Sequence, residues 1–151
     1  MNLTEEPEVI TWPETHYVFV EKVGPFQTNA PQAWQNLHTF VAGIAQHNQI
    51  TGYMSLYKMG PMIYRAGVSV AAHPAVLPQG LSYTGFGGGK FSRFVLTGPY
   101  SELGAATGRV MQIISTTKLP LRDDYFIENY PNDPKTTPEA ELITEILVPT
   151  V

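Results

Sequence analysis

The feature that most constrains the fold of this chain is a similarity between its two halves. The stretch YVFVEKVGPF at 17–26 is echoed by FSRFVLTGPY at 91–100, and both stretches end in a Gly-Pro-aromatic triplet. The two triplets stand about half of the 151-residue chain apart. Because a solenoid needs about three or more repeats, two copies favour a pair of units that close on each other across a pseudo-twofold axis. The repeat therefore predicts a central ligand cleft between the two units.

Both halves show the same order of expected elements. In the first half, periodicity and turn signals predict a strand, an amphipathic helix and two strands, at 9–24, 31–45, 53–58 and 62–70. In the second half the order is repeated by a strand, a helix that Ser101 caps and two strands, the strands at 90–97, 124–130 and 141–148. The Pro- and Gly-rich segment 71–90 is interpreted as the linker between the halves.

These elements predict an α+β fold of duplicated β-α-β-β units, with antiparallel sheets and one helix in each half. The length of 151 residues suits a single domain, 1–151, with pseudo-repeats at about 8–70 and 90–150. With 43% hydrophobic residues the chain can build its core without disulfides, and it has no cysteine.

Composition excludes several classes of function. The net charge is −4 and the basic residues are scattered, so no direct nucleic-acid partner is expected. No apolar run approaches the ~18–20 residues of a membrane helix, so no membrane partner is expected either. The acidic N-terminus has no signal-peptide pattern and cysteine is absent, which favours a cytoplasmic protein. The four histidines share no metal-ligand spacing, and we expect neither a metal nor a cofactor.

One face of the predicted strand 124–130 carries a carboxylate between aromatic side chains. Side chains alternate along a strand, so Phe126, Glu128 and Tyr130 share a face. Aromatic rings attract cations and flat apolar molecules, and a cation–π contact contributes roughly 0.5–2 kcal/mol. Burial among such rings would raise the pKa of Glu128. The alternative interpretation is that Glu128 is a solvated or paired surface residue, which is common for a glutamate on a strand.

When the sequences of the two halves are aligned, the aromatic face of the second half corresponds to a similar face of the first. There the strand 53–58 presents Tyr53, Ser55 and Tyr57, with Ser55 at the position of Glu128. If the two faces converge, they form an aromatic box with a single carboxylate. Because the helices need apolar cover, we expect them to face the side chains of opposite alternation: Met54, Leu56 and Ile127.

Three stretches of the chain carry a family resemblance. They are the paired Gly-Pro-aromatic turns, YRAGVSV at 64–70, and LRDDYFIENYPNDP…TPEAELITEILVPT within 121–150. Together, over roughly 8–150, the chain resembles the GyrI-like small-molecule-binding domain. This domain also serves as the effector-binding module of AraC-type and multidrug-responsive transcription regulators.

The resemblance implies a ligand pocket with a central glutamate on the penultimate strand, which corresponds to Glu128 in this sequence. The other expected pocket residues follow from geometry and not from a motif: Tyr53, Tyr57, Tyr64, Trp34 and Phe19. The regulators of the family carry a DNA-binding helix-turn-helix module, and no such module precedes residue 8 here. We therefore expect a stand-alone member and not a transcription regulator acting alone.

Two functions from different classes follow from this pocket. The first is a sensor or sequestering protein that binds amphipathic, aromatic or cationic small molecules. The alternative is a hydrolase that opens strained or electrophilic cyclic toxins, with Glu128 as general base. A third interpretation is an interaction domain that inhibits a larger protein partner such as gyrase. The sequence leaves these alternatives open, as it does the choice between monomer and dimer.

Overall fold

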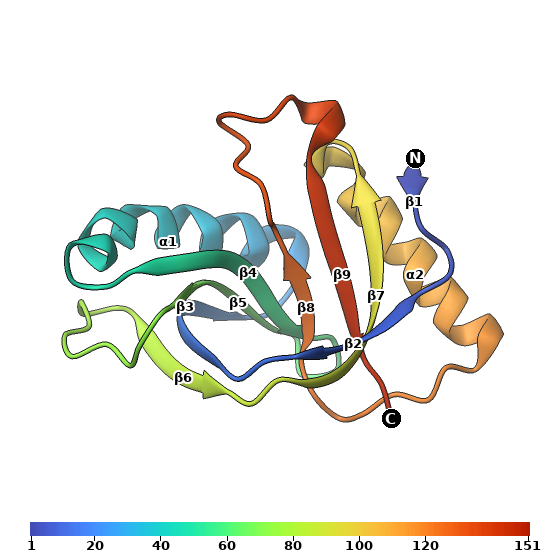
Figure 1. Ribbon diagram of the computed structural model, residues 1–151, viewed down its shortest axis with the longest axis horizontal. Helices are drawn as coiled ribbons and strands as arrows, with labels where there is room; N and C mark the ends of the chain where they lie inside the picture. The colour runs from blue at the N-terminus through green and yellow to red at the C-terminus, as the bar shows by residue number, and fades with distance from the viewer. The chain divides into compact units, whose positions relative to one another are not determined.

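The computed structural model describes residues 1–151 and confirms an α+β fold with antiparallel strands and two long helices (Figure 1). The chain forms two compact units. We call Pro13–Gly88 the first-half unit; the second-half unit combines Met1–Trp12 with Gly89–Val151. The first twelve residues thus belong with the second half of the chain.

The first-half unit contains four antiparallel strands and one helix. Its elements are β3 (Thr15–Val23), α1 (Phe26–His47), β4 (Ile50–Lys58), β5 (Ile63–Val70) and β6 (Ser82–Phe86). The strands lie in the order β4-β5-β3-β6, and α1 packs against β3 and β5. The strand β6 falls within the segment predicted to be a linker, so that prediction is wrong for these five residues. Backbone pairing with β3 makes this segment a strand despite its glycines.

The helix α1 begins five residues earlier than its sequence signals indicate. The turn before it uses Gly24, with φ at +133°, followed by Pro25, whose extended backbone leads into Phe26. A side chain at Gly24 would meet the Asn29 amide at 2.8 Å, so glycine is required there for space as well as for backbone conformation. Pro31, interpreted from sequence as a first-turn residue, lies inside the helix instead.

The second-half unit contains the other helix and five strands. Its elements are β1 (Asn2–Leu3), β2 (Glu8–Trp12), β7 (Gly89–Thr97), η1 (Tyr100–Glu102), α2 (Leu103–Thr117), β8 (Phe126–Asn129), η2 (Glu139–Glu141) and β9 (Ile143–Pro149). The strands β8, β9 and β7 lie side by side in that order, and β1 and β2 both pair with β7. The single strand predicted at 9–24 is in fact two strands of different units, separated at Pro13, which has no backbone N–H for a strand ladder.

The core of the second-half unit shows which sheet face its helix covers. Ala106, Val110 and Ile113 of α2 pack with residues of β7 and β9, among them Ile146. Glu128 is the register partner of Ile146, whereas Ile127 is paired with Leu147. Directly paired residues share a face, so Glu128 lies on the helix-covered face and Ile127 on the opposite one. The expectation that Ile127 faces the helix is therefore wrong.

The first-half unit shows the same reversal. The Trp34 indole of α1 donates a hydrogen bond to Ser55, so α1 packs on the face of β4 that carries Ser55. Met54 and Leu56 lie on the other face, yet they are only 1% and 0% exposed. Apolar side chains on both faces of the strand are buried, and apolar content alone could not identify the face under the helix.

The face of the first-half unit opposite α1 is covered by an aromatic ring. The Tyr17 ring of β3 lies over Gly67 of β5, and its hydroxyl donates to the Met54 carbonyl of β4 at 2.8 Å. A Cβ at position 67 would meet Tyr17 Cζ at 2.5 Å. Glycine at this position lets one tyrosine lie flat across three strands and fix their spacing.

A single arginine fixes the segment that leads into β8. Arg122 donates to the carbonyls of Lys90 and Thr150 and forms an ion pair with Asp124 at 2.8 Å. Its guanidinium also lies 5.0 Å from the centre of the Phe91 ring. These contacts join the start of β7, the end of the chain and the segment before β8, and so position the strand that carries Glu128.

Candidate functional site

The carboxylate of Glu128 is buried in the second-half unit, with 7% of the residue exposed. Tyr130, two residues further along the chain, donates its hydroxyl to Glu128 Oε1 at 3.1 Å. Thr107 of α2 donates to Oε2 over a long distance of 3.5 Å. We call Glu128, Thr107, Tyr130, Tyr100 and Thr144 the Glu128 cluster. Two hydroxyl donors hold the carboxylate, and neither carries a charge.

Burial raises the pKa of Glu128 from an ordinary value of 4.5 to about 7, against the smaller lowering effect of the hydrogen bonds from Tyr130 and Thr107. No arginine or lysine forms an ion pair with this carboxylate. A buried anion without a cationic partner is costly, because the interior solvates charge far less well than water does. The site therefore has an unbalanced negative charge above about pH 7, where the carboxyl is ionised.

Aromatic rings of the second-half unit stand beside the carboxylate. The rings of Tyr100 and Tyr130 meet edge to face, with centroids 5.7 Å apart and planes at 69°. Burial, together with the negative charge of Asp133, raises the pKa of the Tyr100 hydroxyl. Phe126 is half-buried and packs against the core under α2. The structure thus brings together three of the residues that the sequence indicated: Glu128, Phe126 and Tyr130.

A buried hydroxyl in the same cluster has no hydrogen-bond partner. Thr144 of β9 is 0% exposed, and its Oγ1 has no donor or acceptor within reach. It stands two residues before Ile146, the register partner of Glu128, and so shares the face of the carboxylate. Sequence reasoning missed Thr144, Thr107 and Tyr100, because an isolated threonine or tyrosine in a helix or strand has no functional signal of its own.

The first-half unit holds a second aromatic and polar cluster, which we call the Trp34 cluster: Trp34, Ser55, Tyr57, Tyr64 and Phe26. The Trp34 indole donates to Ser55 Oγ at 3.2 Å and to Tyr64 Oη at 2.8 Å. These two oxygens share a hydrogen bond of 2.7 Å. Ser55 is 0% exposed, so the three polar groups form a closed triangle away from water.

The rings of the Trp34 cluster pack on one another. Phe26, the first residue of α1, meets Tyr57 and Tyr64 edge to face at 5.8 and 5.6 Å. Tyr57 and Tyr64 are register partners on β4 and β5, and their rings stack at 6.3 Å. The first-half unit thus places three of its four predicted pocket residues from α1, β4 and β5 in direct contact: Trp34, Tyr57 and Tyr64.

Two predicted pocket residues of the first half lie outside this cluster. Tyr53 is half-buried and lies on the same face of β4 as Ser55, two residues before it. Phe19 lies on the opposite face, where it stacks on Tyr17 with centroids 5.3 Å apart. The Arg65 guanidinium lies 4.3 Å from the centre of the Phe19 ring. The structure therefore does not group Phe19 with Trp34 and Tyr64.

The two clusters occupy equivalent positions in their units. Ser55 is paired with Ala66. Tyr57 is paired with Tyr64, which stands two residues before Ala66. Glu128 is paired with Ile146, and Thr144 lies two residues before that. By strand register alone, Ser55 corresponds to Glu128 and Tyr64 to Thr144.

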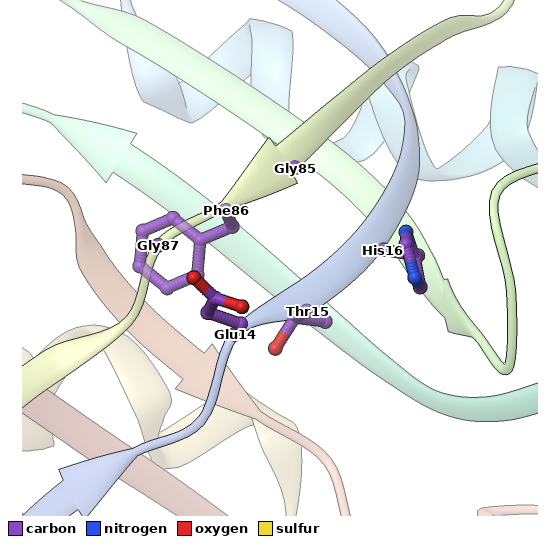
Figure 2. A pocket seen from close by; sticks show the side chains of 6 residues that line it. All are labelled: Glu14, Thr15, His16, Gly85, Phe86 and Gly87. Atoms are coloured by element: carbon purple, nitrogen blue, oxygen red, sulfur yellow. The ribbon is translucent and has the colours of Figure 1, made fainter.

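A separate shallow hollow opens between two strands of the first-half unit. Figure 2 shows its lining residues at the start of β3 and the end of β6, where the two strands pair. Its volume is about 280 Å³, and its lining residues are Glu14, Thr15, His16, Gly85, Phe86 and Gly87. None of the predicted site residues lines it. No group of three or more histidine, cysteine, aspartate or glutamate side chains is placed to hold a metal ion. Neither α1 nor α2 has the length and apolarity needed to cross a membrane.

Antiparallel strands, two helices and a buried carboxylate beside aromatic rings define an α+β domain with a candidate binding site. The comparison with family models identifies the family. Residues 5–151 match the model of the GyrI-like small molecule binding domain, and the chain therefore belongs to this family. A comparison with curated proteins gave no match.

Several solved structures share this fold over nearly the whole chain. The C-terminal domain of EcmrR is 17% identical with a TM-score of 0.76, and the match covers 100% of this chain and 99% of that chain. The structure of SAV2435 bound to tetraphenylphosphonium is 14% identical with a TM-score of 0.72, covering 97% and 94%. A hydrolase from Listeria innocua is 14% identical with a TM-score of 0.62, covering 98% and 93%. At such identities the likeness concerns the fold alone.

Proposed function

We propose that this small-molecule-binding domain captures cationic, aromatic or amphipathic molecules as a sensor or sequestering protein, with Glu128 as the residue that receives the positive charge. The observation that carries the proposal is the buried carboxylate without a cationic partner. A bound cation would supply the missing charge at a site where water cannot. Burial of the unpaired carboxylate costs free energy, and a cation that pairs with it offsets part of this cost, which strengthens binding.

The side chains around Glu128 fit the rest of such a ligand. Tyr100 and Tyr130 offer ring faces and edges to an aromatic body, and cation–π contacts add roughly 0.5–2 kcal/mol each. SAV2435, a protein of similar fold, was solved with a lipophilic cation, tetraphenylphosphonium. EcmrR was solved in a DNA complex, in which the matching part makes up 58% of that chain. These neighbours support a role in sensing small molecules.

Our predicted ligand contacts in the first-half unit remain Trp34, Tyr53, Tyr57, Tyr64 and Phe19. Trp34, Tyr57 and Tyr64 present aromatic surface with hydroxyl and indole groups at its edge. The duplication, the single domain and the monomeric or dimeric state also remain predictions. A common topology, in which β5 lies between β4 and β3 and β9 lies between β8 and β7, supports the duplication.

The direct test is binding of tetraphenylphosphonium, measured by isothermal titration calorimetry at pH 8. We expect Glu128→Gln to weaken binding at least tenfold, about 1.4 kcal/mol, because the amide keeps the shape and loses the charge. Glu139→Gln is the matched control, since Glu139 is exposed and its loss changes the net charge equally. Equal affinity in the wild type and Glu128→Gln would rule out the proposed role of the carboxylate.

A hydrolase is the second candidate, and one observation favours it. A carboxyl with its pKa near 7 is suited to general base catalysis at neutral pH. A structure of similar fold comes from a protein described as a hydrolase. Glu128 would take a proton from a water molecule while the water oxygen attacks a ring carbon. The bond from that carbon to a ring heteroatom would break, and the heteroatom would accept a proton.

Turnover separates the two candidates. The protein is incubated with an aryl epoxide, and the diol product is measured by mass spectrometry. A hydrolase would form product at many equivalents per protein, and Glu128→Gln would abolish it. Binding of the cation without turnover of the epoxide would support the binding protein.

A further inference from the structure

The hydroxyl of Thr144 is not used by any contact described so far. It is fully buried, and Oγ1 has neither a donor nor an acceptor. A buried hydroxyl without a partner destabilises the folded state, and nearly all buried polar groups in proteins are satisfied. A valine of the same shape would fill the position without this cost. The unsatisfied hydroxyl therefore suggests a partner that arrives with the ligand.

The register of β8 and β9 places this hydroxyl within reach of a group bound to Glu128. Thr144 is a diagonal neighbour of Glu128 on the same face, and such neighbours lie about 7–8 Å apart at their Cα atoms. A nitrogen that donates one hydrogen bond to each side chain spans about 6 Å between the two oxygens. The two side chains can therefore be bridged by one small donor group.

Most of the hydrogen-bonding capacity that is left in the Glu128 cluster is for acceptance. Each Glu128 oxygen accepts one hydroxyl, from Tyr130 and from Thr107, and a carboxylate has about four acceptor sites. The Thr144 hydroxyl adds two further acceptor sites and one rotatable donor. A group that matches this set has a positive charge and at least two N–H bonds.

The equivalent position in the other unit has no such vacancy. There the Tyr64 hydroxyl accepts from the Trp34 indole at 2.8 Å and shares a hydrogen bond with Ser55. In the second-half unit the α2 hydroxyl that donates into the cluster, that of Thr107, is directed to the carboxylate and not to Thr144. The Tyr64 hydroxyl is thus satisfied, whereas the Thr144 hydroxyl, on the same face as the carboxylate, is not.

We propose that Thr144 makes this site selective for cations that carry N–H donors, namely protonated primary and secondary amines, over quaternary onium ions. This proposal rests on the proposed function, in which Glu128 receives the charge of the ligand. A quaternary ion satisfies the charge of Glu128 and leaves Thr144 unpaired. A protonated amine satisfies both.

The test compares two ligands with one body and different cationic groups, 4-phenylbutylammonium and (4-phenylbutyl)trimethylammonium. Their dissociation constants are measured by calorimetry at pH 8 for wild type, Thr144→Val and Thr144→Ser. We expect Thr144→Val to weaken the primary ammonium about tenfold, about 1.4 kcal/mol, and to change the trimethylammonium less than twofold. Thr144→Ser keeps the hydroxyl and is expected to keep the wild-type affinity for both.

The outcomes distinguish this proposal from the proposed function. If both ligands bind with dependence on Glu128, and Thr144→Val changes them equally or not at all, the selectivity by Thr144 is wrong and the binding function stands. If neither ligand binds, or if Glu128→Gln binds both as the wild type does, the proposed function fails and this proposal fails with it. The melting temperature of each variant shows that the measurements concern folded protein.

Discussion

The Trp34 cluster and the Glu128 cluster each lie on the helix-covered face of their unit, and the hydrogen bonds of their polar groups differ. In the Trp34 cluster an indole and two hydroxyls satisfy one another in a closed triangle. In the Glu128 cluster a carboxylate has only hydroxyl partners, and one hydroxyl has no partner. The first arrangement stabilises the fold by itself. The second leaves a carboxylate without a cationic partner and a hydroxyl without a hydrogen bond, and this difference makes the Glu128 cluster our candidate for binding a cation.

The largest expected effect comes from placing a carboxylate in the Trp34 cluster. Ser55 is 0% exposed, so Ser55→Glu would bury an anion next to Trp34 and Tyr64. Relative to Ser55→Gln, which has the same size without the charge, we expect a loss of about 3–5 kcal/mol in the free energy of unfolding at pH 8. Urea unfolding at pH 8 and pH 5 measures this. The two variants should converge at pH 5, where the carboxyl can be protonated.

Removing the carboxylate from the Glu128 cluster should instead raise the free energy of unfolding. The folded chain keeps the Glu128 proton up to about pH 7, whereas the unfolded chain loses it near 4.5. Between these values the folded state binds more protons, so the stability falls as the pH rises through this window. At pH 8 we expect Glu128→Gln to be more stable than wild type by roughly 3 kcal/mol, at about 1.4 kcal/mol per pKa unit.

The pH dependence of that difference is the critical observation. Thermal unfolding of the wild type and Glu128→Gln is followed from pH 4.5 to pH 8. The advantage of the variant should grow as the pH rises from 4.5 to 7 and stay constant above 7. An advantage that does not change with pH would show that charge is not its cause.

The smallest expected effect compares two hydroxyls at equivalent positions. Tyr64→Phe removes a hydroxyl bonded to Trp34 and Ser55, and we expect a loss of about 1 kcal/mol in stability. Thr144→Val removes a hydroxyl with no partner, and we expect no loss or a gain of up to about 1 kcal/mol. Chemical denaturation of both variants without ligand measures the contrast. A loss in Thr144→Val as large as that in Tyr64→Phe would mean that Thr144 is already satisfied.

The periodicity of the sequence predicted the order of the main elements of both units and the α+β class. It also placed Phe126 and Glu128 on one face of a strand, because alternation is a local property of the backbone. It failed to show which face the helix covers, since Met54 and Leu56 are buried although they face away from α1. That choice depends on packing between elements distant in sequence.

Other features of the site had no local signal at all. Thr107 becomes notable only because α2 brings its hydroxyl to the Glu128 carboxylate. Thr144 becomes notable only because its buried hydroxyl on β9 has no hydrogen-bond partner. The strand β6 escaped notice because the segment around it is rich in glycine and proline and its pairing with β3 is a tertiary interaction. The assignment of residues 1–12 to the second-half unit was hidden for the same reason.

The separation of β2 from β3 at Pro13 has a consequence for biosynthesis. β1 and β2 leave the ribosome first, but their pairing partner β7 begins only at Gly89. The first-half unit is contiguous in sequence and can fold while the chain is still growing, whereas the unit that carries Glu128 must wait until β7, β8 and β9 have emerged. A circular permutant that starts at Gly89 and joins the two termini would make both units contiguous. In that permutant the unit with the charged site would emerge first, and the order of co-translational folding would be reversed.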